Sequence, residues 1–278
     1  MTRSVRRTRS IRRTLPVTGA GVAALLVLSA CSSSSGSDSG SDAAGSSSSS
    51  STKVSGTVTV FAAASLKESF TALGKTFEKE HPGTRVTFNF GGSDTLAASI
   101  TGGAPADVFA SASPRTMATV TDAGDAAGAP TAFVRNQLEI ATLPGNPDRI
   151  SSLRDLTRSG LKVVLCDKTV PCGAAAQKAL EASGIELTPA SYEQDVKSAL
   201  TKVELKEADA AVVYKTDVQA AGDKVEGVDF PESAKAVNDY PIALLKQAPN
   251  ADAGKAFIEL VKSAEGQKVL TQAGFRTP

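Results

Sequence analysis

The chain has 278 residues, with 30 basic and 29 acidic side chains, one histidine and no tryptophan. Six arginines lie within residues 1–13, and without them 24 basic and 29 acidic residues remain, a net charge of −5. This acidic balance removes the electrostatic basis of nucleic-acid binding, and aromatic residues, at 5% of the chain, are too few to predict a stacking platform for bases or sugars.

The N-terminal segment is typical of an export signal. Basic residues are followed by an apolar run from Val17 to Ala30, which is shorter than a membrane-spanning helix requires. The run ends in Leu28-Ser29-Ala30-Cys31, which is similar to a bacterial lipobox, where the cysteine is lipidated and becomes the new N-terminus. Residues 1–30 are therefore predicted to be a lipoprotein signal peptide. Ordinary cleavage beside an incidental cysteine is the alternative, and Arg12-Arg13 leaves the export route open.

A low-complexity segment follows the predicted lipid-bearing Cys31. Residues 31–53 are nearly all Ser, Gly, Asp and Ala, a composition that cannot bury a core and is typical of a flexible tether. The folded part is expected at 54–278. Its length suits one two-lobed domain or one large α/β domain.

The first half of the folded part alternates strands and helices. Ser65-x-x-Glu68 has the pattern of a capping box, and apolar residues at helical spacing continue from Leu66 to Phe77. Strands are expected at 57–61, 85–90 and 107–110, and helices at 65–80, at 96–100 and from Pro114 onward. This β-α-β-α order predicts a parallel sheet with helices on both faces.

The second half continues the same pattern. Strands are expected at 162–165, 210–214 and 240–245, and helices at 173–182, 196–206, 253–262 and 265–273. The segments 138–141 and 242–245 are candidates for strands that cross between two lobes.

Cys166 and Cys172 are the cysteines that remain once Cys31 is assigned to the lipid. Their spacing is not C-x-x-C, and the single histidine, His81, lies in a Glu-His-Pro-Gly turn, so neither thioredoxin-like chemistry nor a zinc site is favoured. An exported compartment is oxidising and favours a disulfide, worth about 2 kcal/mol for so short a loop.

Four junctions between a strand and a following helix place small or hydroxyl-bearing residues where α/β sheets bind ligands. They lie at Ser65, Ser93, Cys172 and Tyr214. Helix-start amides favour an anion, and hydroxyl groups add neutral donors that discriminate against a protonated ligand. Each residue also has a structural interpretation: Ser65 as an N-cap, Ser93 in a turn, Tyr214 in packing and Cys172 as half of a disulfide.

Taken together, these segments resemble a known family. Phe61-Ala62-Ala63-Ala64-Ser65-Leu66, Gly103-Ala104-Pro105-Ala106-Asp107, Ala211-Val212-Val213-Tyr214 and Tyr240-Pro241-Ile242 occur in the order seen in molybdate-binding solute receptors of ABC importers, the ModA family. The resemblance covers nearly all of 56–278. It implies the α/β, two-lobed periplasmic-binding-protein fold of type II, with parallel-rich sheets joined by two hinge strands.

The lobe boundaries expected from this resemblance are 54–136 with 242–278 for the first lobe and 137–241 for the second. The resemblance also implies an oxyanion site. Ser65 and Ser93 would bind from the first lobe, and the N–H groups of Cys172 and Val196 with the Tyr214 hydroxyl from the second. Two departures are a cysteine at 172, where the family often has a small residue, and Gly91-Gly92-Ser93-Asp94, where it often has a serine run.

The resemblance implies a non-enzymatic receptor without cofactor. Its ligands would be molybdate and tungstate, its partner the permease of an ABC importer, and its form a lipid-anchored monomer outside the cell membrane. Three alternatives stay open: a sulfate, thiosulfate or phosphate receptor of the same fold, an exported hydrolase using Ser65 with His81, and a purely structural lipoprotein. The hydrolase is disfavoured because a helix would separate those two residues by more than about 20 Å.

Overall fold

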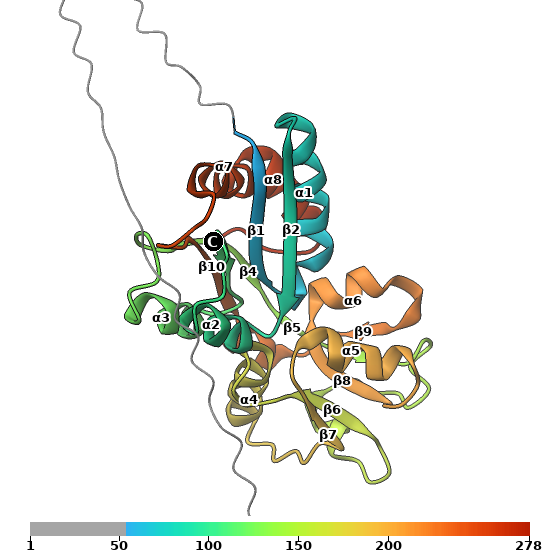
Figure 1. Ribbon diagram of the computed structural model, residues 1–278. Helices are drawn as coiled ribbons and strands as arrows, with labels where there is room; N and C mark the ends of the chain where they lie inside the picture. Colours follow the sequence, from blue (N-terminus) through green and yellow to red (C-terminus); the bar gives the residue numbers. More distant parts are fainter. Residues whose placement is uncertain (1–53) are drawn as a thin grey trace, which may run out of the picture. The chain divides into compact units, whose positions relative to one another are not determined.

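The computed structural model describes residues 54–278, which form two lobes, each built on a five-stranded sheet (Figure 1). The predicted signal peptide, tether and lipidation site at Cys31 lie outside the described residues. Within 54–278, no helix combines the length and the apolar character needed to cross a membrane.

The sheet of the first lobe has the order β2-β1-β3-β10-β4. Its strands, in chain order, are β1 (Gly56–Ala63), β2 (Thr84–Gly91), β3 (Val108–Ala110), β4 (Thr131–Asn136) and β10 (Asn238–Leu244). β1 pairs in parallel with β2 and β3, whereas β10 is antiparallel to β3 and β4. The carboxyl ends of β1, β2 and β3 therefore lie at one edge, which faces the second lobe (Figure 1).

The sheet of the second lobe has the order β7-β6-β8-β5-β9. Its strands are β5 (Leu138–Thr142), β6 (Val163–Cys166), β7 (Ser191–Glu193), β8 (Ala210–Tyr214) and β9 (Glu226–Val228). β6 is parallel to β7 and β8, whereas β5 is antiparallel to β8 and β9. In both sheets, three parallel strands thus begin at one edge, and the fourth strand, β10 or β5, is antiparallel to its neighbours on both sides.

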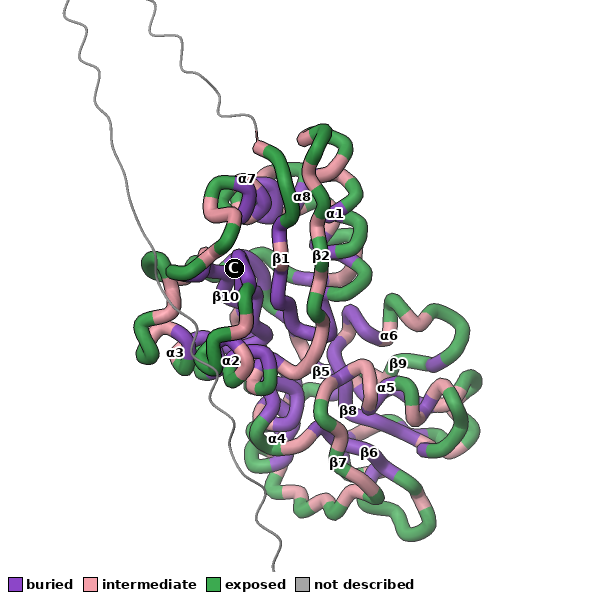
Figure 2. Tube along the Cα trace, viewed as in Figure 1, coloured by how far each residue is buried: buried purple, intermediate pink, exposed green. Residues whose placement is uncertain are grey.

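Helices cover both faces of the first sheet. On one face α1 (Lys67–Glu80), α7 (Ala251–Lys262) and α8 (Ala264–Gln272) enclose a cluster of buried side chains that includes Phe70, Phe77 and Phe257. On the other face α2 (Ser93–Thr101) and α3 (Pro114–Asp122) pack against Phe61 and Phe109. In Figure 2, buried stretches of the chain lie where the helices meet the sheet, and exposed stretches lie on the outer sides of the helices.

In the second lobe the main core contains side chains of α4 (Pro171–Ser183), α5 (Val196–Glu204) and the strands β5, β6 and β8. α6 (Lys215–Ala221) follows β8 directly. Four 3₁₀ helices complete the described chain: η1 (Ala64–Leu66), η2 (Leu153–Thr157), η3 (Gly222–Lys224) and η4 (Pro231–Lys235).

The chain passes between the sheets twice. The first passage is Gln137, between β4 and β5, and the second is the segment 229–237, between β9 and β10. β10 belongs to the first sheet over its whole length, so the second passage precedes Asn238, whereas the expected lobe boundary at 241/242 falls inside this strand. The segments proposed as crossing strands each stay within one sheet.

The predicted alternation of strands and helices is found, with two local differences at helix starts. The capping box at Ser65 is wrong, because Ser65 lies inside η1 and α1 begins at Lys67 without a side-chain cap. α2 begins at Ser93, three residues earlier than expected. Sequence patterns did not predict β4, β7, β9 or α6, most of which are short.

Candidate functional site

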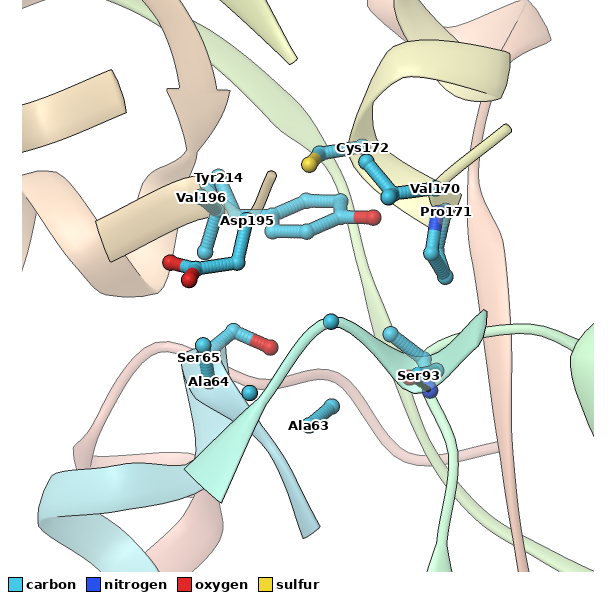
Figure 3. A pocket seen from close by; sticks show the side chains of 13 residues that line it. Ala63, Ala64, Ser65, Ser93, Val170, Pro171, Cys172, Asp195, Val196 and Tyr214 are labelled. Atoms are coloured by element: carbon cyan, nitrogen blue, oxygen red, sulfur yellow. Dashed lines mark hydrogen bonds between the residues drawn. The ribbon is translucent and has the colours of Figure 1, made fainter. Parts of the chain in front are cut away.

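A small cavity lies between the two lobes, at the carboxyl ends of β1 and β2 and the start of α4 and α5 (Figure 3). Its volume, counted as the space open to the centre of a water molecule, is about 20 Å³. Its lining consists of Ala63, Ala64, Ser65, Gly91, Gly92, Ser93, Ala112, Val170, Pro171, Cys172, Asp195, Val196 and Tyr214. All five residues predicted for the oxyanion site are among them.

The first lobe contributes two buried serines. Ser93 is the first residue of α2, and its Oγ accepts a hydrogen bond from the N–H of Ala112 at 3.0 Å. Ser65 lies in η1, with its Oγ 2.9 Å from the hydroxyl of Tyr240. In Figure 3 the Ser65 hydroxyl points into the space between the lobes.

The second lobe contributes the first turn of α4, where the backbone N–H groups have no carbonyl partner within the helix. Cys172 is the second residue of α4 and forms a disulfide with Cys166 at the end of β6, as predicted. The loop between them is tight: a Cβ on Gly173 would lie 1.8 Å from the carbonyl oxygen of Asp167. Only glycine fits there, so the disulfide and Gly173 together shape the loop that carries the Cys172 amide.

Val196 is the first residue of α5, so its N–H also belongs to an open helix start. Asp195 is the N-cap, and its carboxylate accepts from the N–H of Ser198 at 2.9 Å and from the Ser198 hydroxyl at 3.1 Å. Asp195 is the one acidic residue in the lining. Because its oxygens are bonded to its own helix, part of the charge that would oppose an anion is offset.

Tyr214 lies at the end of β8 with 1% of its surface exposed, and its ring points across the cavity (Figure 3). Its hydroxyl oxygen accepts from Nδ2 of Asn238 at 2.7 Å. Burial, with a further contribution from nearby Tyr240, raises the pKa of Tyr214 well above its ordinary value. The hydroxyl therefore stays protonated at physiological pH and can donate its hydrogen.

The three hydroxyl groups share one arrangement. The oxygen of Ser93 accepts from a backbone N–H, and that of Tyr214 accepts from an asparagine amide. Tyr240 accepts from Nδ2 of Asn136 at 3.4 Å, which leaves its own hydrogen available to the oxygen of Ser65. The hydroxyls of Ser93 and Tyr214 thus retain a hydrogen for a ligand, and that of Ser65 does so when Tyr240 is the donor in their pair.

Sequence reasoning did not assign Tyr240, Asn136 or Asn238 to the site. Tyr240 belongs to a Tyr-Pro-Ile segment that contributes to the family resemblance, which was the available signal. The asparagines carry no local pattern, because their role depends on the pairing of β4 with β10.

Positive charge lies next to the cavity and not in its lining. None of the thirteen described lining residues is Lys, Arg or His. Lys197 on α5 pairs with Glu68 of α1 at 3.0 Å and with buried Asp217 of α6 at 3.1 Å. Burial raises the pKa of Asp217 to about 6, against the opposing effect of Lys197.

The lobes contact each other around the cavity. Lys197 of the second lobe pairs with Glu68 of the first, and the Arg115 guanidinium of α3 donates to the carbonyl oxygen of Thr169. The backbone also comes close, since a Cβ on Gly92 would lie 2.7 Å from the carbonyl oxygen of Gln194. These contacts define a closed arrangement of the two lobes.

The pairing of Ser65 with His81 that a hydrolase would need is not formed. His81 is the C-cap of α1 and packs against Phe77 with ring centroids 4.5 Å apart, whereas Ser65 precedes the start of the same helix. The 14 residues of α1 separate the two by about 20 Å. Among the described residues, no three His, Cys, Asp or Glu side chains gather as a metal site would require.

Comparisons with known proteins agree with this architecture. The molybdate-binding protein ModA of Mycobacterium tuberculosis is 44% identical over 227 residues, which cover 82% of this chain and 87% of that protein. The putative ABC transporter substrate-binding lipoprotein YvgL of Bacillus subtilis is 31% identical over 265 residues, 92% of this chain and 95% of that protein.

Among solved structures, the periplasmic molybdate-binding protein of Azotobacter vinelandii matches with a TM-score of 0.70 at 20% identity, over 80% of this chain and 99% of that one. This likeness confirms the predicted two-lobed fold of type II. The family described as bacterial extracellular solute-binding protein matches residues 58–276. The chain therefore belongs to the family of bacterial extracellular solute-binding proteins.

Proposed function

We propose that the protein captures molybdate outside the cell membrane and delivers it to an ABC importer. The observation that carries this proposal is a small interlobe cavity lined by hydroxyl groups that retain a hydrogen and by open helix starts, with no cationic side chain in its described lining. The 44% identical relative that is named as molybdate-binding supports the choice of ligand.

The donor set suits a fully deprotonated tetrahedral oxyanion. Helix-start N–H groups and hydroxyl hydrogens present partial positive charge from several directions, as the four oxygens of such an ion require. A protonated ligand would point its own hydrogen at a hydrogen-bond donor of the protein. Neither the ligand O–H nor that donor would then have an acceptor. The site thereby selects for the charge state of the ligand as well as its shape.

Closure follows from the distribution of donors between the lobes. Ser65 and Ser93 belong to the first lobe, whereas Cys172, Val196 and Tyr214 belong to the second, so the complete set exists only when the lobes meet. A ligand that contacts both halves shifts the equilibrium toward the closed form by its differential affinity for that form. The permease would then recognise the closed receptor.

Tungstate is an oxyanion of the same shape and charge as molybdate and is expected to bind the same site. The lipid on Cys31 would hold a monomeric receptor to the membrane through the tether 31–53, in keeping with the relative named as a lipoprotein. Cys31→Ala is expected to move the protein from the membrane fraction to the medium.

Calorimetric titration of the purified folded part with molybdate, tungstate, sulfate and phosphate tests the ligand. Molybdate and tungstate are expected to bind at one site per chain, with sulfate and phosphate much weaker. Tight sulfate binding without a molybdate response would overturn the proposal in favour of a sulfate receptor. A protein that binds none of the four anions would be a structural lipoprotein.

A further inference from the structure

Two asparagines face each other where the chain passes between the lobes. Asn136 is the last residue of β4, Asn238 is the first of β10, and the two are register partners in the antiparallel pairing of these strands. Their exposed fractions are 1% and 8%. A buried side-chain amide destabilises the folded protein unless it is hydrogen-bonded. The hydrogen-bond partners of these two asparagines therefore indicate their role.

Asn238 connects the first sheet to the second lobe. Its Nδ2 donates to the hydroxyl oxygen of Tyr214 at 2.7 Å and lies 3.4 Å from the carbonyl oxygen of Pro171. A carbonyl only accepts, so the contact with Pro171 fixes the amide with its nitrogen toward both partners. The lone pair of Tyr214 that faces Asn238 is thereby occupied.

Asn136 is fixed in a similar way. Its Oδ1 accepts from the N–H of Gln137 at 3.0 Å, so Nδ2 must face the opposite side. There it donates to the hydroxyl of Thr216 at 2.8 Å and contacts that of Tyr240 at 3.4 Å. Tyr240 in turn lies 2.9 Å from Oγ of Ser65, and either hydroxyl can be the donor in this pair. If Tyr240 accepts from Asn136 and donates to Ser65, the hydrogen of Ser65 is left for the cavity.

We propose that Asn136 and Asn238 are positioning residues that orient the ligand-binding hydroxyls of both lobes as hydrogen-bond donors. Asn238 acts on Tyr214 directly, and Asn136 acts on Ser65 through Tyr240. The inference rests on the proposed oxyanion site, and neither asparagine lines the cavity. Without its amide partner, a hydroxyl can turn its hydrogen toward the protein and present a lone pair to the anion.

The position of the pair adds a second consequence. Both asparagines lie next to the two passages between the sheets, and groups close to a hinge move little when the lobes open. We therefore expect the orienting bonds, which join the two lobes close to the passages, to persist in the open form. The hydroxyls are preorganised before the ligand arrives, which lowers the cost of ordering them on binding.

A double-mutant cycle on molybdate affinity tests the Asn238 branch. Asn238→Leu removes the amide at similar volume and without a new charge, and it is expected to lower affinity about tenfold, as does Tyr214→Phe. The double variant is expected to bind within about twofold of Tyr214→Phe alone, because Asn238 has no hydroxyl left to orient. If the loss of affinity in the double variant equals the product of the two single losses, Asn238 does not act through the Tyr214 hydroxyl, and the inference is overturned.

The Asn136 branch has the same design, with Asn136→Leu and Ser65→Ala as the single variants. The control is Asn146→Ala, which removes an amide that bonds only within its own loop, to the backbone of Ile150 at 2.8 and 2.9 Å. It is expected to lower stability and leave affinity unchanged. Asn238→Ala and Asn136→Ala serve in place of either leucine variant that does not fold.

The wild-type titration separates this inference from the proposed function. If wild type binds sulfate in place of molybdate, the proposed ligand is wrong, and the cycles run with sulfate still decide the role of the asparagines. If wild type binds no oxyanion, both proposals fail together. If wild type binds molybdate and both cycles show independent losses, the function stands and the positioning role falls.

Discussion

Asp217 is a fully buried carboxylate beside the cavity, with Lys197 as its charged partner. Its pKa is raised to about 6 chiefly by burial, so the folded protein holds its proton more tightly than the unfolded chain does. The folded state then binds more protons between about pH 4 and pH 6, and the contribution of this group to stability declines as the pH rises through that range.

Asp217→Asn is expected to remove this dependence on pH. Relative to the variant, wild type should lose about 2 kcal/mol of unfolding free energy from pH 4 to pH 7. The shift from 3.8 to about 6 corresponds to about 3 kcal/mol in full, and the unfolded carboxyl is still partly protonated at pH 4. Urea unfolding of both proteins across this range measures the difference. Asp223→Asn, at an exposed position in η3, is the matched control with no such change. The raised pKa of Asp217 would be contradicted if the difference in unfolding free energy between wild type and variant stayed constant with pH, or if it grew in favour of wild type as the pH rises.

At the level of single residues, sequence reasoning reached the groups that line the cavity and missed those behind them. Ser65 and Ser93 each lie two residues after the end of a strand, and Tyr214 is the last residue of β8, so local patterns are informative at these positions. The role of Ser65 as a helix cap was wrong, because its hydroxyl bonds to Tyr240, 175 positions away in the chain. No window along the sequence contains that contact.

The elements around the cavity are held by short-range constraints. Cys166 ends β6 and Cys172 lies in the first turn of α4, so their disulfide joins the strand to the helix whose open start faces the cavity. The tight loop between them depends on Gly173, where any side chain would meet the backbone of Asp167. The disulfide and the absence of a side chain at Gly173 thus fix the conformation of this loop.

Reduction of the disulfide is expected to lower the unfolding free energy by about 2 kcal/mol, the chain-entropy value for so short a loop. Urea unfolding with and without dithiothreitol measures the change, and a Cys166→Ser, Cys172→Ser variant should be less stable and indifferent to the reductant. Molybdate binding should persist in the folded reduced protein at lower affinity, because the donor from Cys172 is its backbone N–H. Loss of all binding in a folded reduced protein would mean that the sulfur contacts the ligand.

The loop between β2 and α2 approaches the second lobe through Gly92. A Cβ at this position would lie 2.7 Å from the carbonyl oxygen of Gln194, a backbone atom that cannot rotate away. Gly92→Ala is therefore expected to strain the closed form and lower molybdate affinity about tenfold, with little change in the melting temperature of the ligand-free protein. Calorimetry and thermal unfolding measure the two quantities.

The control for this variant is Gly128→Ala, because an added Cβ there meets no atom within 4 Å and the backbone is not in the left-handed region. It should leave both affinity and melting temperature unchanged. Unaltered affinity in Gly92→Ala would show that the two loops separate in the ligand-bound form.

The whole molecule depends on two lobes that contact each other around the cavity and that, within residues 54–278, are linked along the chain through Gln137 and the segment 229–237. The alternation of strands and helices in the sequence is sufficient to predict an α/β fold, whereas the division into two lobes was implied by the family resemblance. The place of the second passage is harder to predict, because the first four residues of β10, Asn-Asp-Tyr-Pro, are not typical of a strand and only the part after the expected boundary at 241/242 is apolar. Its membership of the first sheet is decided by pairing with β3 and β4, which are distant in the chain.

Ligand binding is expected to stabilise and compact the whole protein. At a free molybdate concentration of about 100 times Kd, the unfolding free energy should rise by about 2.7 kcal/mol, and the radius of gyration measured by small-angle X-ray scattering should fall as the lobes close. Tyr214→Phe should require a higher concentration for the same compaction. Stabilisation without any change in the radius of gyration would mean that the free protein is already closed.

The contact between Gly92 and the carbonyl of Gln194 also sets a lower limit on the size of the cavity. The two segments approach so closely that an added Cβ on Gly92 would lie 2.7 Å from the carbonyl oxygen of Gln194, and a backbone atom, unlike a side chain, cannot rotate away. We therefore expect a tetrahedral anion with shorter bonds to make poorer contacts with one of the lobes, because the lobes have little room to move closer to it. Size discrimination in this receptor is then a property of its main chain, and substitutions in the lining would alter how tightly an anion binds more readily than which anion fits.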